Sequence, residues 1–266
     1  MFNPTLYRQG MRSSRTMLAI FISVLAVYFG MIIFMFDPEI GKILTEFSLA
    51  MPELMSMAGM IPASGTLTSF LSAYLYGFLM LVFPMIYSII LANRLMARHV
   101  ERGSMAYLLA APVRRTAVAF TQLCVLITGI ASFTVFVSAF GIICSELWFP
   151  GELDIPEFIL LNAGNLCLQL FIAGICLLCS CAFGDSKYTT AFSAGIPSLA
   201  YIIEMLANIG GDLEGAKHFT FFTLFDPDGL IAREPSALIG SAILLAVALV
   251  LFAVSIRIFD RKDLAI

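Results

Sequence analysis

The sequence has few charged residues and lacks the residue combinations that most enzymes use. Only 12% of its 266 residues are charged and 60% are hydrophobic, whereas soluble domains have about 25% charged residues. The two histidines, His99 and His218, fall on opposite sides of the membrane predicted below and cannot share a site across about 30 Å of hydrocarbon. No serine-hydrolase, zinc-helix or phosphate-loop motif occurs. The sequence therefore indicates an integral membrane protein without a catalytic motif of its own.

Cysteine is present, but not in the pattern of a secreted, disulfide-bonded protein. All six cysteines fall in or at the edge of apolar runs. Cys176, Cys179 and Cys181 form a C-x-x-C-x-C pattern, and thiolates bind soft metals. No cation or histidine lies near them in the sequence to favour the thiolate, so we interpret them as small residues of a membrane helix. A cleavable signal peptide is not expected either, because the first apolar run continues from Met17 without a small-residue cleavage site.

The chain does have six apolar runs, each close to the roughly 20 residues that an α-helix needs to cross a bilayer. We therefore predict an all-α integral membrane fold with six transmembrane helices in one domain, residues 1–266. Pro84 and Pro197 interrupt the second and fifth runs, and membrane helices accommodate such prolines because neighbouring helices bond the freed carbonyls. The predicted spans are 17–36, 70–92, 119–144, 158–183, 190–209 and 237–258.

Basic and acidic residues separate between the two sides of these spans. If the N-terminus is cytoplasmic, twelve of the fifteen Lys and Arg residues lie inside and thirteen of the eighteen Asp and Glu residues lie outside. Cytoplasmic loops carry an excess of Lys and Arg. We therefore predict that both termini are cytoplasmic. The three cations left outside are Lys42, Lys217 and Arg233.

Three segments outside the spans carry further signals. Residues 1–16 contain Asn3 as a cap, Pro4 at the first helical position and arginines at helical spacing, which predicts an interfacial helix; the alternative is a disordered basic tail. Residues 37–69 carry apolar residues near helical spacing, which predicts an outer amphipathic segment. This segment is either a lid over an exit path or a packing element that caps the bundle. The last outside loop is expected to anchor in the membrane interface through Phe219, Phe221, Phe222 and Phe225.

Glu204 is the one ionisable residue clearly inside a predicted span. A charge there is costly, and such residues mark substrate or ion pathways by default. About five residues, some 7–8 Å, separate Glu204 from the outer end of its helix, so its carboxylate can also reach interfacial water or a neighbour's hydroxyl. Glu204 is thus a candidate pathway residue, and a structural interfacial hydrogen bond is the alternative. Asn162, Asn165 and Gln169 in the fourth run are expected to hydrogen-bond between helices.

The longest basic interruption between two apolar runs covers residues 93–118. Five arginines surround a short apolar piece, 105–111, which Pro112 closes. This pattern predicts a short helix on the cytoplasmic face, with apolar anchors for a groove on a soluble partner and charges that steer and orient the contact. The alternative is that these arginines only obey the positive-inside rule.

With these elements in place, the chain resembles the membrane subunit of ABC-2 type transporters. The family's coupling helix between spans two and three has an acidic residue, Gly-Thr, two leucines and Pro-x-x-Arg, followed by a Lys at the start of span three. This sequence keeps the order, with Ser in place of Thr and Gln122 where the Lys is common. The sequences F-D-P-D-G-L-I before the last span and F-D-R-K-D-L near the C-terminus are also similar. The resemblance implies ATPase-subunit contacts through Glu101, Gly103, Ser104, Met105, Leu108, Leu109, Pro112 and Arg115.

The resemblance implies the subunit of an exporter in a bacterial cytoplasmic membrane, with a peptide antibiotic, drug or lipid-like compound as cargo. It implies two ATP-binding cassette subunits, a second permease copy or sibling, and contact with membrane lipid, but no nucleic acid. No cofactor, metal or catalytic residue is expected on this chain, and ATP and Mg are expected on the partner subunit. Two other functions stay open. One is an ion-coupled carrier that works without ATP and in which Glu204 titrates with transport; the other is a non-transporting sensor or immunity subunit.

Overall fold

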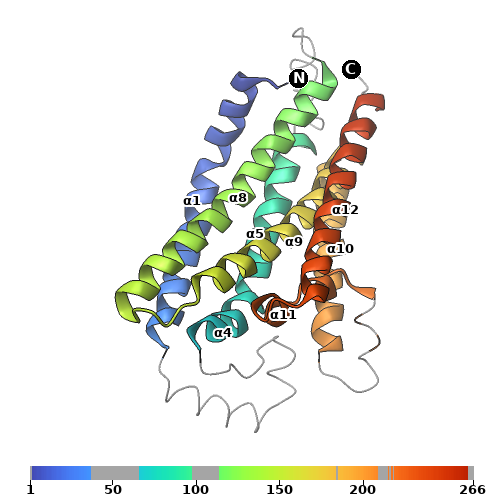
Figure 1. Ribbon diagram of the computed structural model, residues 1–266. Helices are drawn as coiled ribbons and strands as arrows, with labels where there is room; N and C mark the ends of the chain where they lie inside the picture. Colours follow the sequence, from blue (N-terminus) through green and yellow to red (C-terminus); the bar gives the residue numbers. More distant parts are fainter. Residues whose placement is uncertain are drawn as a thin grey trace.

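The computed structural model describes residues 2–36, 66–97, 114–183, 185–208, 215, 217 and 219–262. Within these residues the chain forms eight α-helices, two π-helical turns and one 3-10 turn, without a strand. The long helices run side by side as one bundle (Figure 1). In chain order the elements are α1 (Pro4–Phe34), α4 (Leu67–Leu71), η1 (Ser72–Tyr76), α5 (Leu79–Ala92), η2 (Asn93–Ala97), α8 (Arg115–Trp148), α9 (Ile155–Ala182), α10 (Ser186–Ala207), η4 (Phe222–Leu224), α11 (Pro227–Ile231) and α12 (Pro235–Arg261).

Among the described residues, six helices are long and apolar enough to cross a membrane, in agreement with the six predicted spans. They are α1, the continuous stretch Leu79–Met96, α8, α9, α10 and α12. Several exceed the predicted spans at their ends. With 34 residues, α8 is about 51 Å long at 1.5 Å per residue, which is more than the hydrocarbon core of about 30 Å. Its ends therefore extend beyond the hydrocarbon.

The N-terminal helix differs from the prediction in one respect. Its start is as expected, because Asn3 Oδ1 accepts hydrogen bonds from the N–H groups of Thr5 and Leu6 and Pro4 occupies the first turn. The predicted interfacial helix, 1–16, and the first span are one continuous helix of 31 residues in the structure, not two elements. No proline follows Pro4 within α1, so nothing in the sequence stops the helix at residue 16.

The second span is interrupted near its N-terminal end. Helix α4 leads into the π-helical turn η1, and α5 begins only at Leu79. Between them Phe78 has φ −136° and ψ −61°, outside the helical region. The predicted span 70–92 is therefore made of two pieces, and π-helical turns of this kind are frequent at functional sites.

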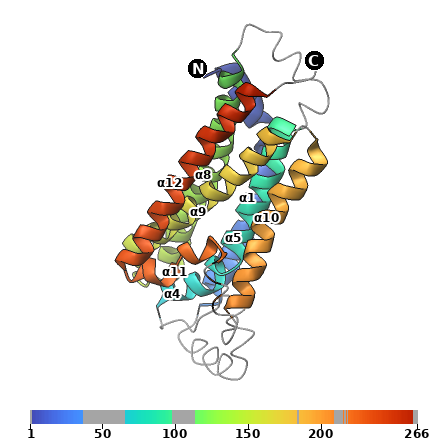
Figure 2. The same cartoon turned by 90° about the vertical axis from the view of Figure 1, so that its right-hand side faces the viewer.

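Both ends of the chain lie at the same end of the bundle, whereas α4 and α11 lie at the opposite end (Figures 1 and 2). This placement follows from the even number of spans. The loop-charge argument predicts that the end with the termini faces the cytoplasm.

Helix α9 is the central element of the bundle. It packs against α5, α8, α10, α11 and α12, and both views place it between α5 and α12 (Figures 1 and 2). Its side chains Leu161, Leu168 and Ile172 are fully buried. The other helices are thus arranged around α9.

The Gln169 side chain of α9 bonds a carbonyl that Pro84 leaves without a donor in α5. Proline has no backbone N–H, so the carbonyl four residues earlier, that of Met80, loses its helical partner. Gln169 Nε2 donates to the Met80 carbonyl at 3.0 Å and to the Leu81 carbonyl at 3.1 Å. An unbonded backbone group in hydrocarbon costs several kcal/mol, so this contact stabilises the packing of α9 on α5. It confirms the interhelical hydrogen bond predicted for Gln169.

A second α9 side chain, that of Cys176, bonds a carbonyl that a proline exposes in α10. Pro197 frees the carbonyl of Ser193, and the buried Cys176 thiol donates to it with Sγ 3.8 Å from the oxygen. A thiol is a weak donor, but it is small enough for a tight helix interface. Cys176 follows Gln169 by two helical turns, so both donors lie on one face of α9. One face of α9 therefore bonds α5 and α10 at the carbonyls that Pro84 and Pro197 expose.

Helix α12 approaches its neighbours closely through small residues. A Cβ on Gly240 would lie 2.4 Å from the Leu224 carbonyl oxygen, so only glycine lets these two backbones come this near. On the facing side of α9, a Cβ on Gly174 would lie 3.0 Å from Leu251 Cβ. Small residues at membrane helix interfaces permit such close packing.

Replacing Gln169 with methionine would keep the side-chain size but remove the donor to the Met80 carbonyl. We expect the free energy of unfolding to fall by about 1–2 kcal/mol, because a buried carbonyl loses its partner. A lower Tm of the detergent-purified protein would report the loss. In a Pro84→Ala background residue 84 has an N–H that can bond this carbonyl, so the same substitution should cost less than half as much. Equal costs in the two backgrounds would contradict the assignment.

Candidate functional site

The predicted contact segment for a soluble partner lies almost entirely outside the described residues. Of its eight residues only Arg115 is described, as the first residue of α8. Arg115 Nη1 donates to the Lys262 carbonyl at 2.9 Å, and Lys262 Nζ donates to the Cys181 carbonyl at 3.0 Å. These bonds join the start of α8 and the ends of α9 and α12. The residues outside the described ranges are Glu101, Gly103, Ser104, Met105, Leu108, Leu109 and Pro112.

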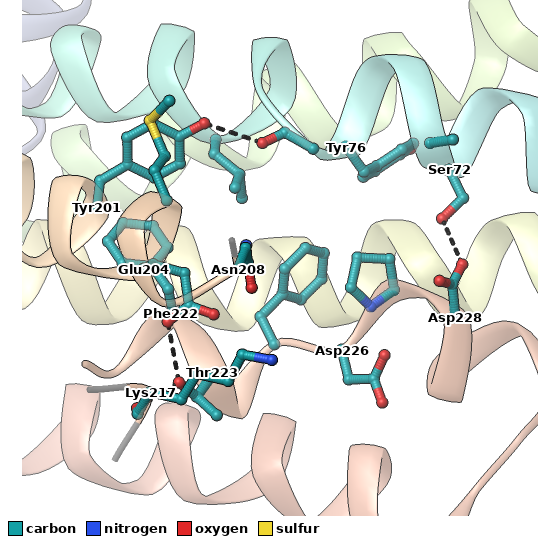
Figure 3. A pocket seen from close by; sticks show the side chains of 16 residues that line it. Ser72, Tyr76, Tyr201, Glu204, Asn208, Lys217, Phe222, Thr223, Asp226 and Asp228 are labelled. Carbon is teal, nitrogen blue, oxygen red and sulfur yellow. Dashed lines mark hydrogen bonds between the residues drawn. The ribbon is translucent and has the colours of Figure 1, made fainter. Parts of the chain in front are cut away.

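A cavity of about 300 Å³ lies at the opposite end of the bundle. Its walls come from η1 and the start of α5, from the end of α10, and from the chain that runs through η4 into α11 (Figure 3). The cavity contains Glu204, the residue that the sequence marks as a pathway candidate. The other residues around it are Ser72, Ala73, Tyr76, Gly77, Leu81, Tyr201, Met205, Asn208, Lys217, Phe222, Thr223, Phe225, Asp226, Pro227 and Asp228.

One wall of the cavity depends on the interruption of the second span. At the interruption, Leu81 N donates to the Phe78 carbonyl at 3.2 Å. This carbonyl lies three residues earlier in the chain, whereas an α-helical N–H bonds the carbonyl four residues earlier. The Gly77 carbonyl instead accepts from the Tyr201 hydroxyl at 3.0 Å (Figure 3). A tyrosine of α10 thus bonds the backbone at the interruption, and it fixes α10 against the second span beside the cavity.

Glu204 lies in the last turn of α10 and is bonded to the loop that follows. The Thr220 hydroxyl donates to Glu204 Oε2. The Thr223 hydroxyl donates to the same oxygen at 2.9 Å (Figure 3). The Thr223 hydroxyl also lies 2.6 Å from the Lys217 carbonyl, and with one proton it donates to only one of the two oxygens at a time. The predicted hydrogen bond from a neighbouring hydroxyl is confirmed. None of the described residues bonds Glu204 Oε1.

The sequence F-D-P-D-G-L-I folds as a capped single-turn helix beside the cavity. Asp226 Oδ1 accepts from Gly229 N at 3.0 Å, and Pro227 fits the first helical position. A Cβ at position 229 would lie 2.4 Å from Asp226 Oδ2, so the cap requires glycine there. Leu230 is buried next, close to Gly164 of α9. The motif thus fixes the orientation of the Asp226 and Asp228 side chains.

The pKa of Asp228, in the wall of the cavity, is raised above its ordinary value. Burial of the carboxyl and, second, the charge of Asp226 raise its pKa, although solvent still reaches part of the side chain. The Ser72 hydroxyl donates to Asp228 Oδ1 at 3.3 Å and acts in the opposite direction (Figure 3). Asp228 therefore holds its proton to a higher pH than an ordinary aspartate.

The cavity combines acidic and aromatic groups. Three carboxylates, those of Glu204, Asp226 and Asp228, share the wall with one ammonium, that of Lys217. The rings of Tyr201 and Phe222 add an aromatic pair with centroids 5.4 Å apart and planes at 66°. Carboxylates attract a cation, and aromatic faces bind one through their quadrupoles. The arrangement suits a small organic cation with an apolar part.

The phenylalanines near the cavity differ from the prediction that all four are interfacial anchors. Phe219 is 85% exposed, which fits an anchor. Phe222 and Phe225 are buried, so the prediction is wrong for them. Phe221 packs against Phe171 of α9 with ring centroids 4.8 Å apart. The reason is that η4 packs against α10 and α12, which covers these rings.

Reasoning from the sequence did not mark Asp226, Asp228 or Tyr201 as site residues. The two aspartates carried a signal, since they flank a helix-starting proline in a loop beside a span. Tyr201 precedes Glu204 by three residues, which places both side chains on one face of α10. This face of α10 could be identified from the sequence, but the residues that lie opposite it across the cavity could not.

Comparisons with known proteins do not place the chain in a family. No protein-family model matches it, and no curated protein sequence matches it. The fold is that of a multi-pass, all-helical membrane protein with six candidate spans.

Asparagine at position 228 would keep the acceptor for Ser72 but remove the charge. Because the pKa of Asp228 is raised above its ordinary value of 3.8, the folded protein binds this proton more tightly than the unfolded chain. The stability from this group is therefore full below about pH 4 and is lost as the pH rises through the raised pKa. We expect the Tm of the unchanged protein to fall relative to that of Asp228→Asn as the pH rises from acidic to neutral.

Asp226→Asn provides a matched second variant for this measurement. Asparagine caps helices about as well as aspartate, so α11 should persist while the charge that raises the Asp228 pKa is gone. The pH range over which ionisation of Asp228 lowers the stability of the folded protein should then become narrower. Tm curves of the three proteins that run parallel at all pH values would show that Asp228 does not titrate as inferred.

Proposed function

We propose that this chain is a transmembrane subunit of an ATP-driven exporter of the ABC-2 type. The observation that carries the proposal is the order of residues in segment 93–118, from Glu101 to Arg115, which resembles the family's coupling helix with Ser104 in place of Thr. The segment lies between the second and third spans, the position that it has in the family. Its flanking elements, η2 and α8, begin or end at the bundle end that holds both termini (Figure 1). ATPase subunits bind this segment from the cytoplasm.

The bonds of Arg115 support a mechanical role for the segment. Arg115 is the last residue of the proposed coupling motif, and it donates to the backbone of Lys262 at the end of α12. Lys262 in turn donates to the end of α9. A displacement of the coupling segment by ATPase closure is thus transmitted to α8, α9 and α12 together. Two of these helices, α9 and α12, extend to the segments that form the cavity at the other end.

The lining of the cavity supports a cationic cargo for the proposed exporter. Among peptide antibiotics, drugs and lipid-like compounds, the three carboxylates and the aromatic rings favour molecules with an amine or guanidinium group. Glu204 Oε1 and the carboxyl group of Asp228 are the groups that meet such a cation. The cavity is at the predicted outer end, where an exporter releases its cargo.

The proposal includes the partners of the family. Two ATP-binding cassette subunits supply ATP and Mg, and a second permease copy or sibling completes the transmembrane unit. The location is a bacterial cytoplasmic membrane with both termini inside.

Replacing Leu108 and Leu109 with aspartate tests the coupling assignment. The proposed contact depends on apolar anchors that enter a groove, and buried unpaired charges are strongly unfavourable in such a contact. We expect loss of the co-purifying ATPase subunit and of stimulated ATP hydrolysis, while membrane insertion stays normal. Affinity purification in mild detergent, with identification of the bound proteins, detects the ATPase subunit. An ATPase assay of the purified sample measures the stimulated hydrolysis.

Methionine at both positions is the matched control, because it retains the apolar surface and should retain the partner. An ATPase subunit that stays bound and stimulated in the aspartate variant would exclude residues 108 and 109 as its docking site. A chain that purifies alone before any substitution would contradict the exporter itself.

An ion-coupled carrier is the second candidate, favoured by the carboxylates at the cavity. Transport of ethidium, a cationic probe, into or out of cells with and without ATP separates the two functions. For the exporter, transport stops on ATP depletion and Glu204→Gln lowers it several-fold, because a carboxylate contact to the cation is lost. For the carrier, transport continues without ATP and Glu204→Gln removes its pH dependence. Glu234→Gln, which changes an exposed carboxylate that does not line the cavity, is the control.

A further inference from the structure

A second cavity, of about 400 Å³, lies at the end of the bundle that holds the termini. Most of its lining belongs to α12, with one residue, Ala182, from the end of α9. Its lining is half cationic and half apolar, with no carboxylate. The lining residues are Ala182, Val254, Arg257, Ile258, Arg261 and Lys262.

Two guanidinium groups, those of Arg257 and Arg261, line this cavity. Arg257 and Arg261 are four residues apart, so they lie on one face of α12, and both are exposed. Within the described residues neither side chain makes a hydrogen bond or an ion pair. Guanidinium groups match the geometry of phosphate with paired N–H donors. The pair is therefore arranged for a phosphate group.

Lys262 adds a third cation that the protein itself holds in place. Its Nζ donates to the Cys181 carbonyl at 3.0 Å, which leaves two of its three N–H donors for a ligand. Partial burial lowers the pKa of its ammonium. A bound anion acts in the opposite direction, because a nearby negative charge favours the charged ammonium.

An exposed aliphatic strip continues from these cations toward the middle of the bundle. It consists of Val254, Val250 and Val247, which are 40%, 59% and 39% exposed. Their spacing places them on the face of α12 that carries Arg257. The strip has the length of two helical turns, about 11 Å, and lies within the predicted span 237–258.

We propose that this cavity binds one anionic phospholipid, with its phosphate against Arg257, Arg261 and Lys262 and an acyl chain along the valine strip of α12. Basic pockets between membrane helices bind anionic headgroups, and the charge of the lining selects them over zwitterionic lipids. The site adjoins the bonds between Arg115, Lys262 and Cys181. A bound lipid thus strengthens the link between α8, α9 and α12. This inference does not depend on the exporter function.

The test is the Tm of the full-length protein, purified in detergent with any subunit that accompanies it, during titration with dioleoylphosphatidylglycerol. We expect a saturable rise in Tm with this lipid and little change with dioleoylphosphatidylcholine. Arg257→Gln with Arg261→Gln should weaken the apparent affinity for phosphatidylglycerol about thirty-fold, the effect of two surface cations. Inorganic phosphate at the same concentrations should not reproduce the rise, because it lacks the acyl chain.

Arg12→Gln with Arg15→Gln is the matched control. It removes the same charge from an exposed face of α1 at the same end of the bundle, away from the cavity. This control should keep the affinity, and lysine at 257 and 261 should restore part of it. Native mass spectrometry of each variant counts the retained lipid independently of stability. Equal lipid effects in the glutamine variants at 257/261 and at 12/15, or a full effect of inorganic phosphate, would overturn the site.

Discussion

The bundle depends on one constraint, that a backbone carbonyl in hydrocarbon must find its donor within the protein. Two of the six spans contain a proline in the interior of the helix and therefore expose a carbonyl, that of Met80 in α5 and that of Ser193 in α10. Helix α9 supplies both donors, Gln169 and Cys176, from one face. A helix that bonds both exposed carbonyls has to contact α5 and α10 together, which is the position that α9 has in the bundle.

The parts of the fold that the sequence predicted are those set by local composition. Hydropathy identified all six spans, and the capping signals at Asn3 and Pro4 identified the start of α1. The interruption at Phe78 was not predictable, because the residues around it are as apolar as the rest of the span and their backbone is fixed by the tertiary bond from Tyr201 to Gly77. The continuity of α1 was missed because a cluster of arginines indicated an interfacial element, although nothing in the chain ends the helix there.

Of the residues in the candidate site, only Glu204 was predicted from the sequence. Glu204 stood out because a charge within an apolar run is rare. Asp226 and Asp228 did not, since aspartates in a polar loop are ordinary until folding places them against α4 and η1. The segment from Glu101 to Pro112 lies outside the described residues, so its coupling role stays a prediction. The basic cavity at α12 was not predicted either, because Lys and Arg residues near the ends of spans are interpreted first as signals of membrane topology and not as a ligand site.

The positions of these bonds also determine where the molecule can open. At the prolines, α5, α9 and α10 are joined by buried bonds whose loss leaves carbonyls unsatisfied in hydrocarbon. At the acidic cavity, by contrast, α10 and α11 are held to the second span by the Tyr201–Gly77 and Ser72–Asp228 bonds. Each such bond contributes only about 0.5–1.5 kcal/mol where water can replace it. Separation at the cavity is therefore the less costly motion, and the bonded faces of α9 act as its fixed base.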